Sequence, residues 1–352
     1  RSNAATTRSR QPPRGGKCSM AMARSSQQRR AGTFWAFPAS DALLQLARTT
    51  MKTALWIVCG VFAALWTGQA RAIDNDVDDE VITVPYDPRP VPSAKQAHHS
   101  LRWRHVPAHS ILLKELKTGT TLYQFESEKR LSPASLTKIM SALVILEYGH
   151  LDDEVTVSPK AARAHKTHLR LRTGQIFRLE DLLKAMLIVS ANDACLAASE
   201  HVGGDEARFV DLMNAKAAAL ELHNTHFSNA CGFDAPEHYS TAEDLAKLSE
   251  IALHHPVFKE LVREEREIIM PINEHRAYVL RTTNRLLGRI PGVQGVKTGF
   301  TSKAGRCLIA KVSQDGSDLL LVILNSKRRW NTATSLINYG LRLSDSRAAL
   351  AR

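Results

Sequence analysis

The hydrophobic positions change their spacing twice along the chain. Two short runs at 111–116 and 121–125 have the character of β-strands, and the turn residues 117–120 between them predict a hairpin. A helical spacing then runs from Ser132 and Pro133 to about residue 148, where a glycine follows. Ser132 is a suitable N-cap and Pro133 suits the first helical position, so we expect the helix to begin there.

Residues 158–250 have mostly helical periodicity, and β-type runs return after about residue 263. The helical periodicity is clearest in two sets of apolar residues: Leu179, Leu182, Leu183, Met186 and Leu187, then Phe209, Leu212, Met213 and Leu220. The later strands are expected at 267–270, 278–281, 294–301, 306–312 and 319–324, and a last helix at 332–343. Strands that flank a helical insertion predict an α+β fold with one antiparallel sheet and a helical subdomain.

The N-terminal segments differ from the rest of the chain. Residues 51–72 have the layout of a secretory signal peptide: a positive start at Lys52, an uncharged apolar run, and Ala70-Arg71-Ala72 as a small-x-small cleavage site. An uncleaved anchor is the alternative, although the apolar run is shorter than the roughly 20 residues of a spanning helix. We interpret residues 1–50 as a disordered basic leader, or an untranslated extension, and residues 73–107 as a linker. One folded domain then covers 108–345, with a tail at 346–352.

The positive charge belongs to the N-terminus. The formal net charge is +12, but residues 1–72 hold eleven basic residues and one acidic residue, whereas residues 73–352 hold 36 and 34. The folded part is therefore nearly neutral, and we expect no nucleic-acid partner. With 44% hydrophobic and 23% charged residues, the chain has an ordinary globular balance.

The cysteines and histidines give no metal-ligand pattern. Beyond the signal peptide, Cys195, Cys231 and Cys307 lie far apart without C-x-x-C spacing. We favour buried free thiols, and one disulfide in an oxidising compartment is the alternative. The H-x-x-H pairs at 165–168 and 223–226 are interpreted as surface histidines, and we expect neither a metal nor a cofactor.

Three short motifs occur in order along the chain. They are S-x-x-K at Ser135-Leu136-Thr137-Lys138, S-x-N at Ser190-Ala191-Asn192, and K-T-G at Lys297-Thr298-Gly299. A second K-T-G at 117–119 is explained by the hairpin turn. Each motif is weak alone, but the three in this order and in these elements are a specific signal for a serine nucleophile.

The first motif places a serine beside a lysine. Ser135 lies in the first turn of the predicted helix, where backbone amides and the helix dipole favour negative charge. Lys138 is three residues on and shares its face. A serine hydroxyl needs an adjacent base, and a lysine can serve when burial or a neighbouring cation lowers its pKa. Apolar residues follow Lys138, which favours burial.

The second and third motifs supply the remaining polar groups. Ser190 can relay a proton and Asn192 can bind a peptide, although a helix cap using Asp193 is the simpler alternative. Lys297 would add positive charge that lowers the pKa of Lys138.

Thr298 could bind a substrate carboxylate, and Gly299 leaves room for a substrate close to the strand. If this strand lies at a sheet edge, it can pair with an extended substrate.

These residues resemble the low-molecular-mass penicillin-binding proteins, the serine-type D-alanyl-D-alanine carboxypeptidases of peptidase family S11. The resemblance covers about residues 108–343. Besides the three motifs, it rests on the segments at 131–135, 179–183, 190–194, 213–216, 224–227, 238–242 and 295–301. It implies the β-lactamase/transpeptidase-like fold, an antiparallel sheet flanked by helices with a helical subdomain.

The resemblance also implies an activity. Ser135 would attack the bond between the terminal D-alanines of a peptidoglycan stem peptide, with Lys138 as base and Ser190 and Asn192 assisting. Lys297 and Thr298 would hold the terminal carboxylate.

The backbone amides of Ser135 and Phe300 would form the oxyanion hole. Gly299 would lie between the carboxylate site and the Phe300 amide. Water would hydrolyse the acyl-enzyme, and β-lactams would acylate the serine.

Three other functions use related machinery. A D,D-endopeptidase that cleaves peptidoglycan crosslinks has the same motifs. A β-lactamase is disfavoured because Ala191 occupies the middle of S-x-N and no E-x-x-L-N occurs between Asn192 and Lys297. A non-catalytic β-lactam or peptidoglycan sensor would acylate without turnover.

The resemblance and the signal peptide together predict the cellular location. We expect an exported enzyme of the periplasm or the outer face of the inner membrane, acting in cell wall remodelling. Many members of the family carry a second β-rich domain and a C-terminal amphipathic anchor. This chain stops at Arg352, so no C-terminal membrane anchor is expected.

Overall fold

The computed structural model describes residues 107–350, with side chains up to residue 344. The predicted leader, the signal peptide and all but the last residue of the linker lie outside these residues. No helix in the described range is long and apolar enough to cross a membrane.

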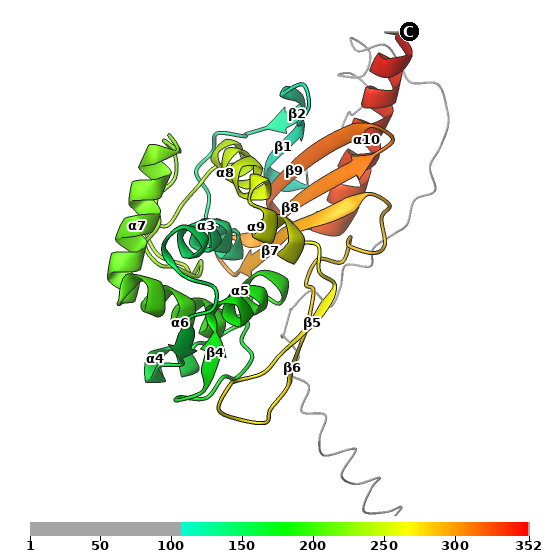
Figure 1. Cartoon of the computed structure of the whole chain (residues 1–352). Coiled ribbons are helices and arrows are strands. Elements are labelled where there is room, and N and C mark those ends of the chain that lie inside the picture. Colours follow the sequence, from blue (N-terminus) through cyan, green and yellow to red (C-terminus); the bar gives the residue numbers. More distant parts are fainter. Residues whose placement is uncertain (1–106, 351–352) are drawn as a thin grey trace, which may run out of the picture. The chain divides into compact units, whose positions relative to one another are not determined.

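A five-stranded antiparallel sheet forms the centre of the domain, in the order β2-β1-β9-β8-β7 (Figure 1). Its strands are β1 (Ala108–Glu115), β2 (Thr120–Phe125), β7 (Val293–Thr301), β8 (Gly305–Gln314) and β9 (Ser317–Ser326). The pairing of β1 with β9 joins the two ends of the domain. Strand β7 pairs only with β8 among the described strands, so it lies at an edge.

Both faces of the sheet are covered, which explains the nearly continuous apolar runs in β8 and β9. Successive residues of β9 alternate between two cores: Leu320 and Val322 pack on the helical side, whereas Leu321 and Ile323 pack under α10 (Arg329–Leu350). This alternation follows from the two-residue period of a strand. The sheet therefore separates a large helical layer from the single helix α10 (Figure 1).

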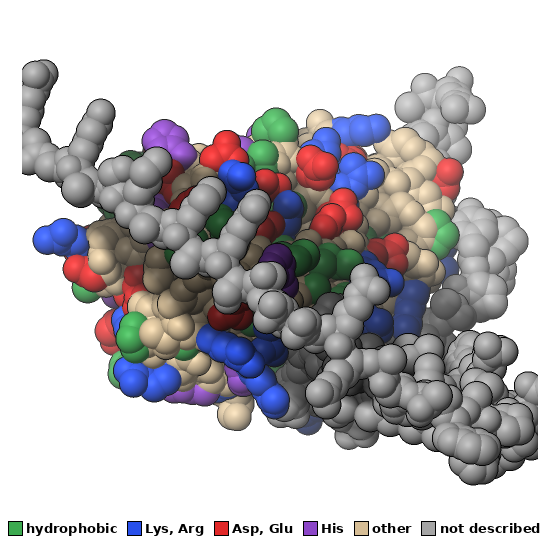
Figure 2. Space-filling view, turned by 60° about the horizontal axis from the view of Figure 1, so that its bottom comes forward, with side chains coloured by type: hydrophobic (Ala, Val, Ile, Leu, Met, Phe, Trp, Pro, Cys, Tyr) green, Lys and Arg blue, Asp and Glu red, His purple; other side chains and the backbone are tan. Residues whose placement is uncertain are grey.

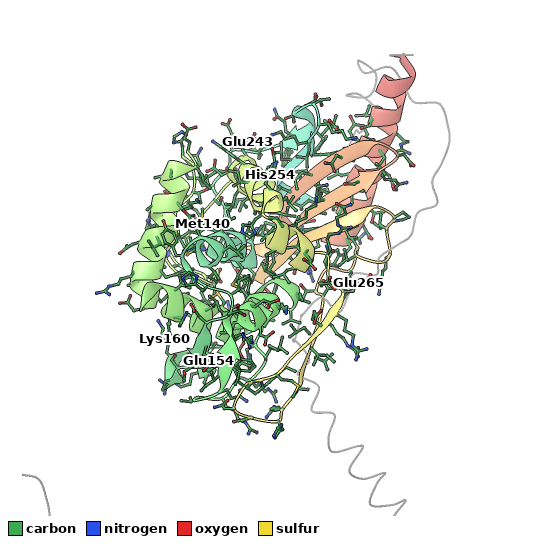
Figure 3. The ribbon with its side chains drawn as sticks, viewed as in Figure 1. Met140, Glu154, Lys160, Glu243, His254 and Glu265 are labelled. Carbon is green, nitrogen blue, oxygen red and sulfur yellow. A yellow bond between two sulfur atoms is a disulfide. The ribbon has the colours of Figure 1, made fainter. Side chains whose placement is uncertain are left out.

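The helical layer is built around α3 (Lys138–Tyr148). Around it lie α5 (Leu179–Ile188), α6 (Asn192–Gly203), α7 (Glu206–Ala219) and α8 (Ala242–His254), with the short helices α4 (Pro159–Ala162) and α9 (Pro256–Leu261). Met140 of α3 is fully buried within this layer, whereas Glu243 and His254 are carried by α8 (Figure 3). Eight consecutive buried residues from Lys138 onward explain why α3 lacks a polar face.

The predicted α+β fold with a central antiparallel sheet is confirmed, but two pairs of strands lie outside that sheet. Strands β5 (Arg266–Ile269) and β6 (Tyr278–Arg281) form a separate hairpin, and β3 (Glu154–Thr156) pairs with β4 (Ile176–Arg178) inside the region predicted as mostly helical. Periodicity identifies a strand without identifying its partner, and three-residue strands are too short to show a period. The last helix also runs past residue 343, where the prediction ended it.

The start of the first helix differs from the prediction. A 3-10 turn, Ala134–Thr137, comes first and α3 begins at Lys138, with Ala134 at φ +49°. Ser132 is not an N-cap: its buried Oγ has no hydrogen-bond partner within the described part of the chain. Tertiary contacts of this turn, described below, override the local capping preference.

The expectation of free thiols is wrong for two of the three cysteines. Cys195 on α6 and Cys231 form a disulfide across 36 residues of sequence, while Cys307 is a buried free thiol. Burial raises the pKa of the Cys307 thiol to about 12, so it stays protonated. Sequence spacing could not reveal the pair because helix packing brings the two residues together.

The surface of the domain carries mixed charges. Figure 2 shows Lys and Arg side chains interspersed with Asp and Glu over the coloured part of one face. A nucleic-acid interface needs a contiguous basic surface, and the expected absence of a nucleic-acid partner stays a prediction.

Candidate active site

The 3-10 turn and the start of α3 place Ser135 directly beside Lys138. Lys138 Nζ lies 3.2 Å from Ser135 Oγ. Ser135 is half-buried and lines a cleft of about 350 Å³, whereas Lys138 is fully buried behind it. The three-residue spacing of S-x-x-K thus gives the expected proximity.

The amine of Lys138 contacts three oxygens, one of which is Ser135 Oγ. Nζ donates to Asn192 Oδ1 at 2.8 Å and to the carbonyl oxygen of Cys231 at 2.6 Å. Burial first, and the charge of Lys297 second, hold the pKa of Lys138 well below its ordinary value, while Asp193 opposes them. The lowered pKa favours the neutral amine of Lys138 over the ammonium ion.

A neutral amine has two N–H groups and one lone pair. Carbonyl oxygens only accept, so Asn192 and Cys231 take the two N–H groups of Lys138. The amide orientation of Asn192 is consistent with this, because its Nδ2 donates to the carbonyl oxygen of His165 at 2.9 Å. The lone pair of Nζ is left for the hydroxyl proton of Ser135, which is the geometry of a general base.

Ser190 lies in the turn between α5 and α6 with a left-handed backbone, φ +64°. A non-glycine residue in this conformation is strained, and such strain concentrates at functional sites. Its Oγ accepts from Lys297 Nζ at 2.9 Å. Ser190 is thus held at the cleft wall, which it lines together with Ser135.

The K-T-G motif lies on the edge strand β7, against the 3-10 turn. Lys297 is 1% exposed, and Thr298 Oγ1 lies 2.6 Å from Thr283 Oγ1. A Cβ on Gly299 would lie 3.2 Å from the backbone nitrogen of Ser135. The glycine therefore permits the close approach of β7 to the serine, and Phe300 follows at the cleft wall.

Several residues of the cleft carry no motif. Lys166, Thr167 and His168 line it from one loop, and Thr283, Thr301, Ser302 and Arg329 line it from other segments. His168, interpreted as a surface histidine, is thus a cleft residue. The sequence analysis assigned none of these positions to the site, although His168 belongs to an H-x-x-H pair and Thr301 ends a predicted strand.

Asp193 organises the loop that supplies the first three of these residues. Its carboxylate accepts from the backbone N–H groups of Leu169 at 2.9 Å and Leu171 at 3.0 Å. Burial raises the pKa of Asp193 in spite of these hydrogen bonds. The backbone N–H of Asn192 also donates to Thr167 O at 2.8 Å. The S-x-N turn therefore holds this cleft loop as well as Lys138.

Arg329 is a further cleft residue that sequence reasoning missed. It opens α10, is fully buried, and donates from Nη1 to the carbonyl oxygens of Gly299 at 3.0 Å and Cys307 at 3.2 Å. A buried guanidinium at the cleft fixes the end of β7 and adds positive charge next to Thr298. In the sequence it is the third of three basic residues, Lys327-Arg328-Arg329, that follow strand β9.

Comparisons with known proteins agree with this geometry. The family model for D-alanyl-D-alanine carboxypeptidases matches residues 94–328. The chain belongs to this family, peptidase S11. The carboxypeptidase DacF of Bacillus subtilis is 34% identical over 240 residues, 66% of this chain and 61% of the relative. DacC of Escherichia coli is 33% identical over 270 residues, 72% of this chain and 66% of the relative.

Solved structures of the S11 type share the fold. A point mutant of the Streptomyces K15 DD-transpeptidase superimposes with a TM-score of 0.62 at 30% identity, covering 67% of this chain and 98% of that one. A D-alanyl-D-alanine carboxypeptidase of Mycobacterium tuberculosis gives 0.63 at 27% identity, with coverage of 67% and 92%. The predicted transpeptidase-like fold is therefore confirmed. The chain spans slightly less than two thirds of the length of the two curated relatives above.

Proposed function

We propose that this protein hydrolyses the terminal D-Ala-D-Ala bond of peptidoglycan stem peptides through an acyl-enzyme on Ser135. The observation that carries the proposal is the environment of Lys138, whose two carbonyl partners leave its lone pair for the hydroxyl of Ser135. Family membership supports the same chemistry. Residues 108–345 would form the catalytic domain.

In the acylation step, Ser135 Oγ attacks the carbonyl carbon between the two D-alanines and its proton passes to Lys138. The backbone amides of Ser135 and Phe300 stabilise the oxyanion. Loss of one such donor typically lowers the rate by about 10²–10³. Collapse of the tetrahedral intermediate breaks the C–N bond, and the leaving amine receives, through Ser190, the proton that Lys138 accepted. Water then hydrolyses the ester.

The substrate would lie along the edge strand β7. An extended peptide can pair with the outer edge of β7 in the described sheet. Gly299 has no side chain and so lets the peptide approach Ser135. Thr298 would bind the terminal carboxylate, with Lys297 and Arg329 supplying positive charge. Asn192 would assist on the opposite wall. β-Lactams mimic the D-Ala-D-Ala end and would acylate Ser135.

The proposed location is outside the cytoplasm, in the periplasm or at the outer face of the inner membrane. The signal-like segment at 51–72 and the substrate of the family support it. The disulfide is consistent with an oxidising compartment.

Purified protein and a Ser135→Ala variant are incubated with pentapeptide monomers and with crosslinked dimers, and the products are identified by mass spectrometry. Loss of one alanine from the monomers, absent in the variant, is the expected result. Cleavage of dimers with intact monomers would make the protein a D,D-endopeptidase instead. Labelling of Ser135 by a penicillin without turnover of either substrate would overturn the proposal in favour of a sensor.

A further inference from the structure

The disulfide joins two segments that both contact Lys138. Cys195 lies on α6, three residues after Asn192, whose Oδ1 accepts from Lys138 Nζ. Cys231 belongs to the loop 229–233, and its own carbonyl oxygen is the other acceptor. The disulfide therefore links the two segments that carry the acceptors of the Lys138 amine, Asn192 Oδ1 and the Cys231 carbonyl oxygen.

The loop 229–233 packs directly under the turn that carries Ser135. A Cβ on Gly232 would lie 2.0 Å from the carbonyl oxygen of Ala134, so the two backbones are in direct contact. Ser141 of α3 donates to Ala230 O at 2.5 Å. Within the loop, Asn229 Oδ1 accepts from the backbone N–H of Gly232 at 2.8 Å and of Phe233 at 2.9 Å.

What ties this loop to α6 is chiefly the sulfur bridge. Both cysteines are buried, and the other contacts between the two segments are weak: Cys195 Sγ lies 3.4 Å from Ala230 O, and Cys231 Sγ lies 3.9 Å from Asn192 O. A sulfur in a disulfide carries no proton, so these are packing contacts and neither is a hydrogen bond. Hydrogen bonds from Ser141 and Lys138 hold the loop to α3, whereas the disulfide is its covalent tie to α6, so the loop can shift relative to α6 when that bond is absent.

We propose that the Cys195–Cys231 disulfide positions Lys138 as the general base, by holding the Cys231 carbonyl oxygen against its amine. The inference rests on the acyl-enzyme chemistry proposed above. Without the bond, the carbonyl moves away, the amine rotates, and its lone pair no longer faces Ser135. A displacement of about 0.5 Å is enough for a loss of about tenfold in acylation.

Loosening this region also admits water to Lys138. Burial is the largest cause of the lowered pKa of Lys138, so partial hydration raises that pKa toward its ordinary value. The other charged or titratable groups that face the lysine are Lys297 on β7, Asp193 on α6 and His238, and none of them is changed by removing the sulfurs. The acidic limb of the acylation rate should therefore move to higher pH.

The test compares wild-type protein with a Cys195→Ala/Cys231→Ala variant. The second-order rate constant for acylation of Ser135 by a fluorescent penicillin is measured between about pH 5 and 10, together with the thermal midpoint. A Leu336→Ala variant is the control, because this buried leucine lies in the core under α10 and its loss lowers stability without touching the loop. We expect the cysteine variant to lose about tenfold or more with the acidic limb shifted upward, and the control to keep the wild-type rate and profile.

A reductive arm covers the case in which the variant does not fold. Wild-type protein is treated with a dithiol, which gives two electrons and two protons to the disulfide, yielding two cysteine thiols and the cyclic disulfide of the reagent. The reduced fraction is counted by alkylation and mass spectrometry. The acylation rate should fall with the reduced fraction while the circular dichroism stays native.

Each outcome separates this inference from the proposed function. No labelling of Ser135 in oxidised wild-type protein would reject the proposed function itself. Normal labelling in wild type together with an unchanged rate and pH profile in the variant would overturn only the positioning role. Unfolding of both the variant and the reduced wild type would also overturn the positioning role, because the disulfide would then be required for the folded state itself.

Discussion

Gly299 lies where the edge strand β7 meets the turn that carries Ser135, and replacing it with alanine tests that contact. The added Cβ would lie 3.1 Å from Pro133 O, 3.2 Å from Ala134 Cβ and 3.2 Å from Ser135 N. Carbon atoms in good contact are about 3.5–4.0 Å apart. To reach the short end of that range, the turn must move away from the strand by roughly 0.3–0.5 Å.

That displacement sets the size of the effect. A misplacement of 1 Å costs about 10² in rate, so we expect acylation by a penicillin to slow by about 4- to 10-fold. Overpacking costs about 1–3 kcal/mol, and the lower entropy of the unfolded alanine chain returns about 0.4–1 kcal/mol. The net loss of stability is then about 0–2.6 kcal/mol.

The second K-T-G offers a matched control. Gly119 ends this copy in the hairpin turn, with φ +69° and no atom within 4 Å of an added Cβ. A Gly119→Ala variant carries the backbone penalty of a left-handed alanine, about 1 kcal/mol, and should acylate at the wild-type rate. Stopped-flow fluorescence with a reporter penicillin measures the rate, and urea unfolding measures the stability.

Two results would refute this reasoning. Wild-type acylation in Gly299→Ala would mean that the contact between β7 and the turn does not position Ser135. An equal slowing in Gly119→Ala would mean that a general loss of stability, rather than the contact, controls the rate.

Two further predictions concern charge. In Lys297→Met, loss of the cation that helps lower the pKa of Lys138 should raise that pKa, so the acidic limb of acylation moves to higher pH; an unmoved limb in the pH–rate profile would contradict this. Burial lowers the pKa of His238 from 6.5 to about 4, so between these values the unfolded chain binds a proton that the folded chain does not. Stability should therefore be highest above pH 6.5 and fall by about 3 kcal/mol as the pH drops through 4. Urea unfolding against pH should show a flatter dependence in His238→Gln, and identical slopes would exclude His238 as the cause.

Much of the fold followed from periodicity. Strand β6 lies where the pattern placed it, and β7 differs by one residue at its start. Strand β6 alternates between buried and more exposed residues, as the two-residue period of a strand requires, whereas β7 is a mostly buried run. The separate β5–β6 hairpin was not foreseen, because local pattern carries no information about which strands pair.

The candidate site was likewise predictable from the sequence only in part. The S-x-x-K spacing alone brings Ser135 and Lys138 together, since residues three apart share one face of a helical turn. The partners of Lys138 could not be found by spacing: one is a backbone carbonyl, which every residue has, and only the path of the loop selects Cys231. Long-range contacts likewise bring Arg329 to the cleft and let Asp193 hold the cleft loop.

The sequence by itself determined the order of the elements, the three motifs and the family, because these depend on local spacing and residue type. The tertiary structure decided which side of the Lys138 amine faces Ser135 Oγ. It also decided that β7 is an edge strand and that Cys195 pairs with Cys231. Each of these depends on packing between segments far apart in the chain. Such packing is set by the combined burial of many side chains, and no single stretch of sequence records it.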